Sequence, residues 1–369
     1  MIYLAVFAFT LITIFSVSGK QKKSIVQKSF SEMIFGMSLL SIFAFAILVG
    51  INSKRADYIN YLQTFRNSPI IGEPELLKYA TSQHTEIAYN YFQALVKTLG
   101  GSATFFFVIF CLISLSVRYK FYTGFISKKD IGLVFLIFFA HEFLRKDCVQ
   151  IRNGFASALV LASLVALYKG YKCRFVFIVF IASKFHTVAL IALPLLFVKH
   201  ERNKNYEKAL LYILFLAFVV SIFFHVRILL SLFVGMNLLP SQIITYLNWS
   251  TYLTSMSLLN PLLLKQFTIM VWVLLKRKYL FQDSRIFFLS QVYLLSTVYY
   301  LVFRDFEILA ARFGSLFYAV EAPLLVLAIE KSGKNIVLKK LALCFFYMAL
   351  FLFNYFTYQE FLGWKPEFN

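Results

Sequence analysis

The sequence predicts an all-α integral membrane protein of about 12 transmembrane segments (11 to 13), and three observations carry this prediction. Hydrophobic residues occupy 60% of the 369 positions and charged residues only 15%, which excludes a water-soluble fold. Apolar runs approaching the width of a bilayer recur along the chain. The basic residues, which give a net charge of +20, lie in short clusters between these runs, where they orient a membrane protein. These basic clusters therefore indicate membrane topology, and we expect no nucleic-acid partner.

Eleven apolar runs are candidate segments, and one of them is interpreted as two. The runs fall near residues 2 to 18, 32 to 51, 103 to 117, 131 to 144, 150 to 168, 173 to 198, 209 to 226, 261 to 275, 286 to 303, 308 to 329 and 336 to 358. The run 173 to 198 carries Lys184 and His186 at its centre, where a charge costs about 2.5 to 3.5 kcal/mol in a continuous span. Two short helices that meet in a hydrated, protein-lined cavity avoid this cost. We therefore predict a broken hairpin around Lys184 to His186, with a single span as the alternative.

Loop charge favours the hairpin. With it, six short loops that hold 23 of the 37 Lys and Arg residues fall on one side, as expected of cytoplasmic loops. They are residues 19 to 31, 118 to 130, 169 to 174, 199 to 208, 276 to 285 and 330 to 340. Two longer loops, about 52 to 102 and 227 to 260, then face outward, as do both termini. With no internal repeat or linker, residues 1 to 369 are expected to form a single polytopic membrane domain.

Arginines beside carboxylates stand out among the ionisable residues on the outward-facing side. Three groups contain them: Arg55 with Asp57 and Tyr58; Arg145 with Asp147, Gln150 and Arg152; and Arg304 with Asp305, Glu307 and Arg312. A guanidinium stays charged and forks onto phosphate oxygens, so arginines at a membrane boundary predict an anionic lipid-linked ligand, above all a diphosphate. Snorkelling or mutual pairing of these charges is the alternative for each of them.

Arg152, His186 and Glu86 carry the most specific arguments. Arg152 opens the apolar helix 154 to 168, where its charge opposes the positive end of the helix dipole, so an anion held there would relieve the conflict. His186 stands at the predicted break, with a structural capping role as its alternative. Glu86 precedes an amphipathic segment that we expect to fold back onto the membrane, and its alternative is simple exposure to solvent.

Motifs of soluble catalysis are absent from the sequence. It contains no phosphate-binding glycine loop, no H-E-x-x-H and no G-x-S-x-G, and its four cysteines have no C-x-x-C spacing. We therefore expect no cofactor and no bound metal.

Four short motifs, taken in order, resemble the EpsG-like family of Wzy-type polysaccharide polymerases. They are Arg55-x-Asp57-Tyr58-x-x-Tyr61-x-x-x-Phe65, then Glu86-x-x-Tyr89, then Gln150-Ile-Arg152-Asn153 with Ala156, then Ala182-Ser-Lys-Phe185-His186 to Pro194. Ala311-Arg312-Phe313 with Tyr318 is similar to the family's arginine at the start of a late span. Family members often carry Glu-Pro-Gly-Tyr where this chain has Glu86-Ile-Ala-Tyr89, and Arg-Gln-Ala where it has Arg152-Asn153-Gly154.

The resemblance implies a polymerase of the bacterial inner membrane whose active site faces the periplasm. Such an enzyme moves a growing glycan from undecaprenyl diphosphate onto a new lipid-linked repeat unit. Its expected partners are therefore the lipid-linked donor and acceptor oligosaccharides and membrane lipid, together with a chain-length regulator protein. A flippase or transporter of the same lipid-linked sugars, an O-antigen ligase and a membrane acyltransferase are the alternatives.

The implied reaction needs a stabilised leaving diphosphate and a deprotonated acceptor hydroxyl. We assign the diphosphate to Arg152 and Arg312. Further candidates for substrate binding are Arg145, Arg304, Arg55, Lys184, Tyr58, Asp147 and Gln150. His186 is the favoured base because imidazole exchanges protons near neutral pH, and Asp57 and Glu86 compete with it. Inversion by one displacement and retention through a carboxylate nucleophile both stay open.

Overall fold

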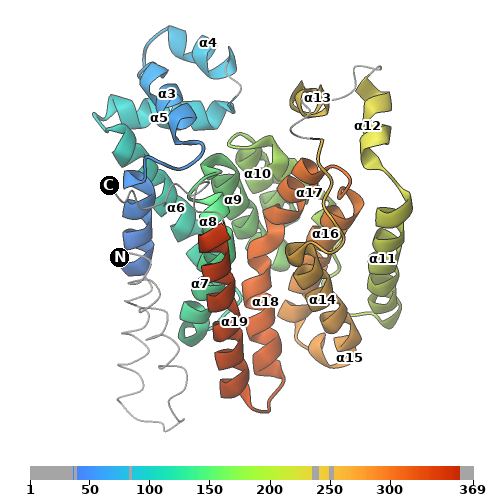
Figure 1. The fold of residues 1–369 in the computed structure, drawn as a ribbon. Helices are drawn as coiled ribbons and strands as arrows, with labels where there is room; N and C mark the ends of the chain where they lie inside the picture. Colours follow the sequence, from blue (N-terminus) through green and yellow to red (C-terminus); the bar gives the residue numbers. More distant parts are fainter. Residues whose placement is uncertain (1–35, 37–39, 83–84, 235–240, 249–252, 358–369) are drawn as a thin grey trace. The chain divides into compact units, whose positions relative to one another are not determined.

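The computed structural model describes residues 36, 40–82, 85–234, 241–248 and 253–357, and every regular element within them is a helix (Figure 1). Six helices in this described part of the chain are long and apolar enough to cross a membrane. They span Ala103–Thr123, Ile151–Tyr168, Lys204–Phe223, Ser284–Val302, Glu307–Lys331 and Ile336–Thr357. An all-α membrane protein is thereby confirmed, whereas twelve segments stay a prediction. The expected segment 2 to 18 and the loop 19 to 31 lie outside the described residues.

Three shorter apolar helices occupy further predicted segments, namely Leu40–Ile51, Thr187–Phe197 and Pro261–Leu275. The run 173 to 198 is divided between two helices. α10 (Lys172–Ser183) ends just before Lys184, and the 3-10 helix η3 (Thr187–Phe197) begins just after His186. The helical run is thus interrupted at the residues where the sequence predicts a break, and its placement in the membrane as a hairpin stays a prediction.

The chain divides into two compact units. Unit 1 comprises residues 1–193 and 325–369, and unit 2 comprises residues 194–324. That the whole chain forms one membrane domain stays a prediction.

Three packed helices form the centre of unit 1. α9 (Ile151–Tyr168) packs against α6 (Ala103–Thr123) and against α10. Phe110 of α6 stacks on Phe155 of α9, with ring centroids 4.5 Å apart. Because α9 is buried on nearly all sides, its sequence is apolar around the whole helix.

A second helical run of unit 1 packs against α19 (Ile336–Thr357). It begins with η1 (Lys128–Asp130) and continues through α7 (Ile131–Phe138), the π-helical turn η2 (Phe139–Phe143) and α8 (Leu144–Lys146). The predicted segment 131 to 144 is therefore helical with a wide turn in its second half. Such π turns are rare and often lie near functional sites.

The predicted outer loop 52 to 102 is itself mostly helical. It contains α3 (Tyr58–Asn67), α4 (Glu75–Ser82) and α5 (Ile87–Thr98). Apolar side chains on one face of α3 and α5 join a buried cluster with the first half of α6: Tyr61, Phe65, Tyr89, Phe106, Phe107 and Phe110. The amphipathic pattern of this region therefore reflects helices folded onto the start of α6.

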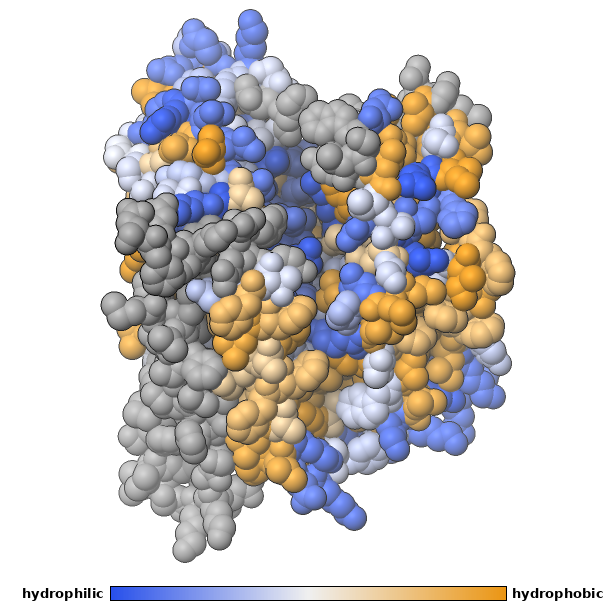
Figure 2. All heavy atoms as spheres, in the orientation of Figure 1, coloured by the Kyte–Doolittle hydropathy of each residue, from blue (hydrophilic) through white to orange (hydrophobic). Residues whose placement is uncertain are grey.

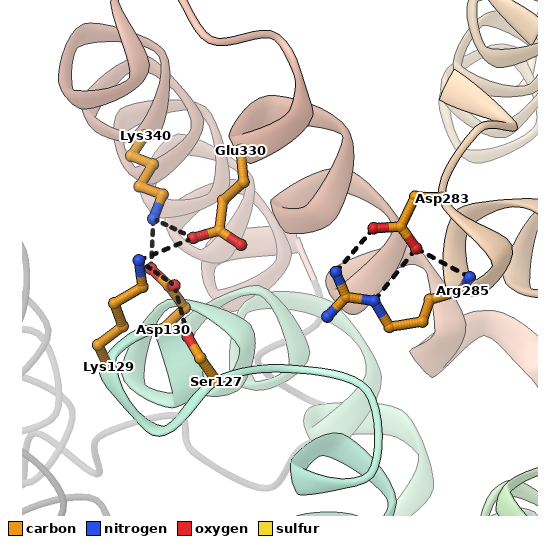
Figure 3. A network of polar contacts seen from close by, with 7 residues as sticks. All are labelled: Ser127, Lys129, Asp130, Asp283, Arg285, Glu330 and Lys340. Carbon is orange, nitrogen blue, oxygen red and sulfur yellow. Dashed lines mark hydrogen bonds and ion pairs between the residues drawn. The ribbon is translucent and has the colours of Figure 1, made fainter. Parts of the chain in front are cut away.

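Contacts between loops agree with the predicted sidedness. In unit 1, Lys129 lies 3.3 Å from Glu330, and Lys340 binds Asp130, so the predicted cytoplasmic loops 118 to 130 and 330 to 340 meet (Figure 3). In unit 2, Arg202 Nη2 donates to Lys278 O at 3.3 Å, so two further predicted cytoplasmic loops, 199 to 208 and 276 to 285, also meet.

One basic residue of that topology count is placed differently. We counted Arg118 with the loop 118 to 130, but α6 continues to Thr123 and buries Arg118 completely. Its guanidinium pairs with Asp147 inside unit 1. Arg118 is thus an internal charge and carries no topology information.

The helices of unit 2 pack around α16 (Ser284–Val302). α11 (Lys204–Phe223), α14 (Pro261–Leu275) and α17 (Glu307–Gly314) all contact it. Arg285, at the start of α16, forks onto Asp283, and burial, which would raise the pKa of Asp283, is outweighed by this partner, so that pKa is lowered (Figure 3).

Shorter elements complete unit 2. α17 continues through η5 (Ser315–Val320) into α18 (Glu321–Lys331), which ends in unit 1. α15 (Arg277–Leu280) follows α14. The predicted outer loop 227 to 260 contains α12 (Val226–Val234) and α13 (Ser241–Asn248).

The outer surface of α19 shows what surrounds the protein. Figure 2 shows an apolar surface along this helix, with hydrophilic residues gathered at the turn between α18 and α19. Its exposed apolar side chains include Val337, Leu338, Phe345, Phe346, Phe353 and Phe356. An apolar face of this extent is stable in lipid and unfavourable in water.

Candidate functional site

The carboxylate of Glu86 brings three of the predicted site residues together in unit 1. Arg152 Nη1 donates to Glu86 Oε2 at 2.5 Å. His186 Nδ1 lies 3.9 Å from Glu86 Oε1, which also accepts a hydrogen bond of 3.2 Å from the backbone N–H of Thr187. An arginine, a carboxylate and an imidazole therefore form one cluster from three segments that lie 34 to 100 residues apart in the sequence.

Each member of the cluster stands at a helix end. Glu86 is the residue that precedes α5, Arg152 is the second residue of α9, and His186 lies in the break after α10. A backbone hydrogen bond of 2.9 Å from Ala88 N–H to Lys184 O joins α5 to the break. As predicted, Arg152 lies at the positive end of its helix, and the anion beside it in this structure is Glu86.

Two buried tyrosines line the cluster. The guanidinium carbon of Arg152 lies 5.6 Å from the centre of the Tyr89 ring, and Tyr89 OH accepts a 3.1 Å hydrogen bond from Gln93. Burial raises the pKa of Tyr61 to about 12, although the charge of Arg152 opposes this, and burial also raises the pKa of Tyr89. Both phenols therefore stay neutral at physiological pH.

The cluster is recessed from the outer end of α6. Phe155, three residues after Arg152, packs on Phe110, which is seven residues into α6. At 1.5 Å per residue, the Phe110–Phe155 contact lies roughly 10 Å along α6 from its start, and α9 begins only four residues before Phe155, so α9 starts below the outer end of α6. A charged group at this depth needs partners, which Glu86 and the helix ends supply.

Basic residues mark the opposite end of the same helices. α9 and α10 are joined by a short turn that carries Lys169 and Lys172, and Arg152 and Ser183 lie at the other ends of these two helices. The topology predicted from loop charge keeps this basic turn in the cytoplasm and would put the cluster in the outward-facing half of unit 1.

Arg152 keeps hydrogen-bonding capacity in this arrangement. Its side chain is 21% exposed, and that of Glu86 is 15% exposed. The Nε of Arg152 has no hydrogen-bond partner among the residues that the structure describes. The Nε itself is buried, so a second anionic oxygen could bind only the exposed part of this guanidinium.

The comparison with family models decides the identification. The EpsG family model matches residues 35–366. This chain belongs to the EpsG family. The match contains all the members of the cluster, and it supports a function of the polysaccharide polymerase kind. Among curated proteins and among solved structures, no significant match to the chain was found.

The structure places the first arginine group of this EpsG-family chain beside aromatic rings. Arg55 is buried, donates to the backbone oxygen of Val49, and lies 4.3 Å from the centre of the Phe107 ring and 5.2 Å from that of Tyr58. Asp57 precedes α3 and is partly buried. These contacts hold the start of α3 against α6.

The second group is spread over the turn before α9. Asp147 is buried and paired with Arg118, whereas Gln150 directly precedes α9. Arg145 is partly buried, and within the described residues its guanidinium makes no hydrogen bond or ion pair. Lys184 is exposed at the break, with its ammonium 4.5 Å from the centre of the Phe180 ring.

The third group lies in unit 2. Arg304 donates to the backbone oxygens of Ser221, at 2.6 Å, and Met256, at 3.2 Å, so it ties the end of α11 to the segment before α14. Arg312 is partly exposed, and its guanidinium carbon lies 4.7 Å from the centre of the Tyr246 ring. Arg304 is thus bound to two backbone oxygens, whereas the contact shown for Arg312 is with an aromatic ring.

Two features of the site were missed from the sequence. The hydrogen bond from the backbone N–H of Thr187 to Glu86 cannot be predicted from residue type, because it depends on how the chain turns after His186. The burial of Arg118 could have been predicted. Arg118 directly follows an apolar run of fifteen residues, and a helix that continued for about two more turns would include it.

Proposed function

We propose that this EpsG-family protein is a Wzy-type polymerase of the bacterial inner membrane. It transfers the growing glycan from undecaprenyl diphosphate to a new lipid-linked repeat unit at the periplasmic face. The observation that carries the proposal is the recessed cluster of Glu86, Arg152 and His186, because it combines an anion-binding guanidinium with proton-accepting groups.

The donor diphosphate binds Arg152 in the proposed reaction. It competes with Glu86 for the guanidinium, whose charge then neutralises the negative charge that develops on the leaving group. Arg145, seven residues before Arg152, and Lys184, two residues before His186, are the further candidates for the second phosphate. Arg312 stays a prediction from the sequence for the same ligand.

The acceptor hydroxyl attacks the anomeric carbon of the donor in the same step. A new carbon–oxygen bond forms, the bond to the diphosphate oxygen breaks, and the undecaprenyl diphosphate leaves as an anion. The hydroxyl proton passes to His186. One displacement of this kind inverts the anomeric centre.

Glu86 links donor binding to the base. In this structure His186 Nδ1 accepts a 3.3 Å hydrogen bond from Val188 N–H, while Glu86 pairs with Arg152. Once the donor occupies Arg152, the released carboxylate attracts a proton onto Nδ1, 3.9 Å away, and the lone pair moves to Nε2. The base is thereby activated only when a donor is bound.

A gel profile of surface polysaccharide tests the proposed function. A strain that lacks the gene is complemented with wild type, Arg152→Ala or His186→Ala at matched membrane levels, and Arg285→Ala, whose ion pair lies in unit 2, is the control. Polymerase function predicts surface lipid with a single repeat unit in the deletion, and a long-chain ladder only with wild type and the control.

The alternatives give different profiles. If no repeat unit reaches the surface of the deletion strain, the protein is a flippase or a ligase and the assignments above are wrong. If Arg152→Ala restores the full ladder, Arg152 does not hold the donor.

A further inference from the structure

A buried ion pair lies beside the segment that leads into α9. Arg118 Nη2 on α6 is 3.3 Å from Asp147 Oδ2, and the two side chains are 0% and 1% exposed. Ser114, one turn earlier on α6, donates to Asp147 Oδ1 at 2.5 Å. Asp147, predicted as a substrate ligand, is thus held by α6.

The same guanidinium also holds α9. Arg118 Nη2 donates to the backbone oxygen of Gly154 at 2.7 Å, and Gly154 lies two residues after Arg152. Arg118 therefore contacts both the segment before α9 and the first turn of α9, on either side of the arginine in the cluster.

Two further contacts tighten this turn. Lys146 Nζ donates to Asn153 Oδ1 at 3.0 Å. At Gly154 the chain passes so close to Lys146 that an added Cβ would lie 2.4 Å from the Lys146 backbone oxygen, which only glycine avoids. The residues next to Arg152 are thus fixed from two directions.

Stability alone does not account for this arrangement. A buried ion pair costs much of what it gains, and well-packed apolar residues of the same volume are often as stable. The Nε and Nη1 of Arg118 have no hydrogen-bond partner in the described part of the chain. Charged residues kept inside a membrane at such cost commonly serve function.

We propose that Arg118 is a positioning residue that fixes the first turn of α9 so that Arg152 points at the lipid diphosphate. The proposal rests on the proposed function in one respect, the binding of the donor diphosphate by Arg152. Arg118 itself contacts no substrate and acts through Asp147 and the Gly154 carbonyl.

A double-mutant cycle tests the proposal. Purified protein in detergent is titrated with undecaprenyl diphosphate, and its Kd is measured for wild type, Arg118→Lys, Arg152→Ala and the double variant. We expect Arg118→Lys to raise Kd about tenfold alone and less than about twofold in the Arg152→Ala background, because coupled sites are not additive. Ser114→Ala, which removes only a hydrogen bond to Asp147, gives a milder change of the same kind.

Lys340→Met is the matched control, since it breaks a different buried ion pair of unit 1. We expect this variant to lower the melting temperature with little change in Kd. Additive effects of Arg118→Lys and Arg152→Ala, or a loss of binding in Lys340→Met that equals that of Arg118→Lys, would overturn the proposal.

The same data separate this inference from the proposed function. If the variants show the expected coupling in diphosphate binding but wild type makes no polymer from lipid-linked repeat units, positioning stands and polymerisation falls. If wild type polymerises and the coupling is absent, polymerisation stands and positioning falls.

Discussion

Two clusters of charged side chains in unit 1 differ in how completely they are paired. In the cluster of Asp130, Glu330 and Lys340, Lys340 contacts both carboxylates, and the paired Lys340 and Asp130 side chains are only 6% and 2% exposed (Figure 3). In the cluster of Arg152 and Glu86, these two side chains are 21% and 15% exposed, and Arg152 Nε lacks a partner among described residues. We call the first cluster closed because its Lys340–Asp130 pair is buried, although Glu330 is 26% exposed, whereas the second can accept a ligand at the exposed part of the Arg152 guanidinium.

Removal of Arg152 should have the largest effect on the polymerisation rate. A small effect would contradict the view that this cluster binds the ligand and the other does not. Arg152→Ala is expected to lower polymerisation by about a thousandfold, because it removes charge stabilisation of the leaving diphosphate. Arg152→Lys should recover only part of the rate, since an ammonium cannot fork onto two oxygens. Initial rates with purified lipid-linked repeat units measure this, and equal rates for wild type and Arg152→Ala would remove it from the site.

Disruption of the closed cluster should lower the free energy of unfolding. Lys340→Met leaves the buried Asp130 carboxylate without its main partner, and we expect a loss of about 3 kcal/mol in unfolding free energy. Thermal unfolding in detergent measures the loss, and the polymerisation rate per folded molecule should stay near wild type. A stable but inactive Lys340→Met would contradict the division of roles.

Glu86→Gln should lower the rate at saturating donor by about a hundredfold, because a neutral amide cannot draw a proton onto His186. The pH profile of kcat sharpens this prediction. In wild type the rate should fall as His186 protonates at acidic pH, and in Glu86→Gln the fall should move to lower pH, since the neighbouring negative charge is gone. An unchanged profile would place the base elsewhere.

Acid pH should weaken the closed cluster by a smaller amount. Burial would raise the pKa of Asp130, but hydrogen bonds with Glu330 and Lys340 outweigh it, so that pKa is lowered. A lowered folded-state pKa means that the stabilisation is complete above the unfolded value of about 4 and is lost as pH falls through the folded value. Melting temperatures between pH 6 and pH 3 should therefore fall less in Asp130→Asn than in wild type.

Chelation should have the smallest effect. Arginines hold the diphosphate in the proposed reaction, so excess EDTA is expected to leave the rate of purified enzyme unchanged. Loss of activity that magnesium restores would show that a cation assists them.

The sequence predicted the elements better than their partners. Hydrophobic run lengths and loop charges predicted the long helices and the break at Lys184 to His186, because both follow from the energetics of lipid. That Arg152 and His186 both meet Glu86 could not be derived, since it depends on helices folded over α6. Asp147 and Arg55 show the limit of the method, because an arginine or carboxylate in a motif looks the same whether it binds a ligand or supports the fold.

The backbone hydrogen bond between Ala88 and Lys184 bears on the departure of this chain from the family motif. Where members often have Glu-Pro-Gly-Tyr, this chain has Glu86-Ile-Ala-Tyr89. The hydrogen bond to Lys184 uses only the backbone N–H of the third residue of this motif. Proline suits the first position of a helix, which is that of Ile87, and glycine offers the same N–H as Ala88. The exchange of Pro-Gly for Ile-Ala therefore preserves both the helix start and this hydrogen bond, and both sequences can hold the carboxylate in the same place.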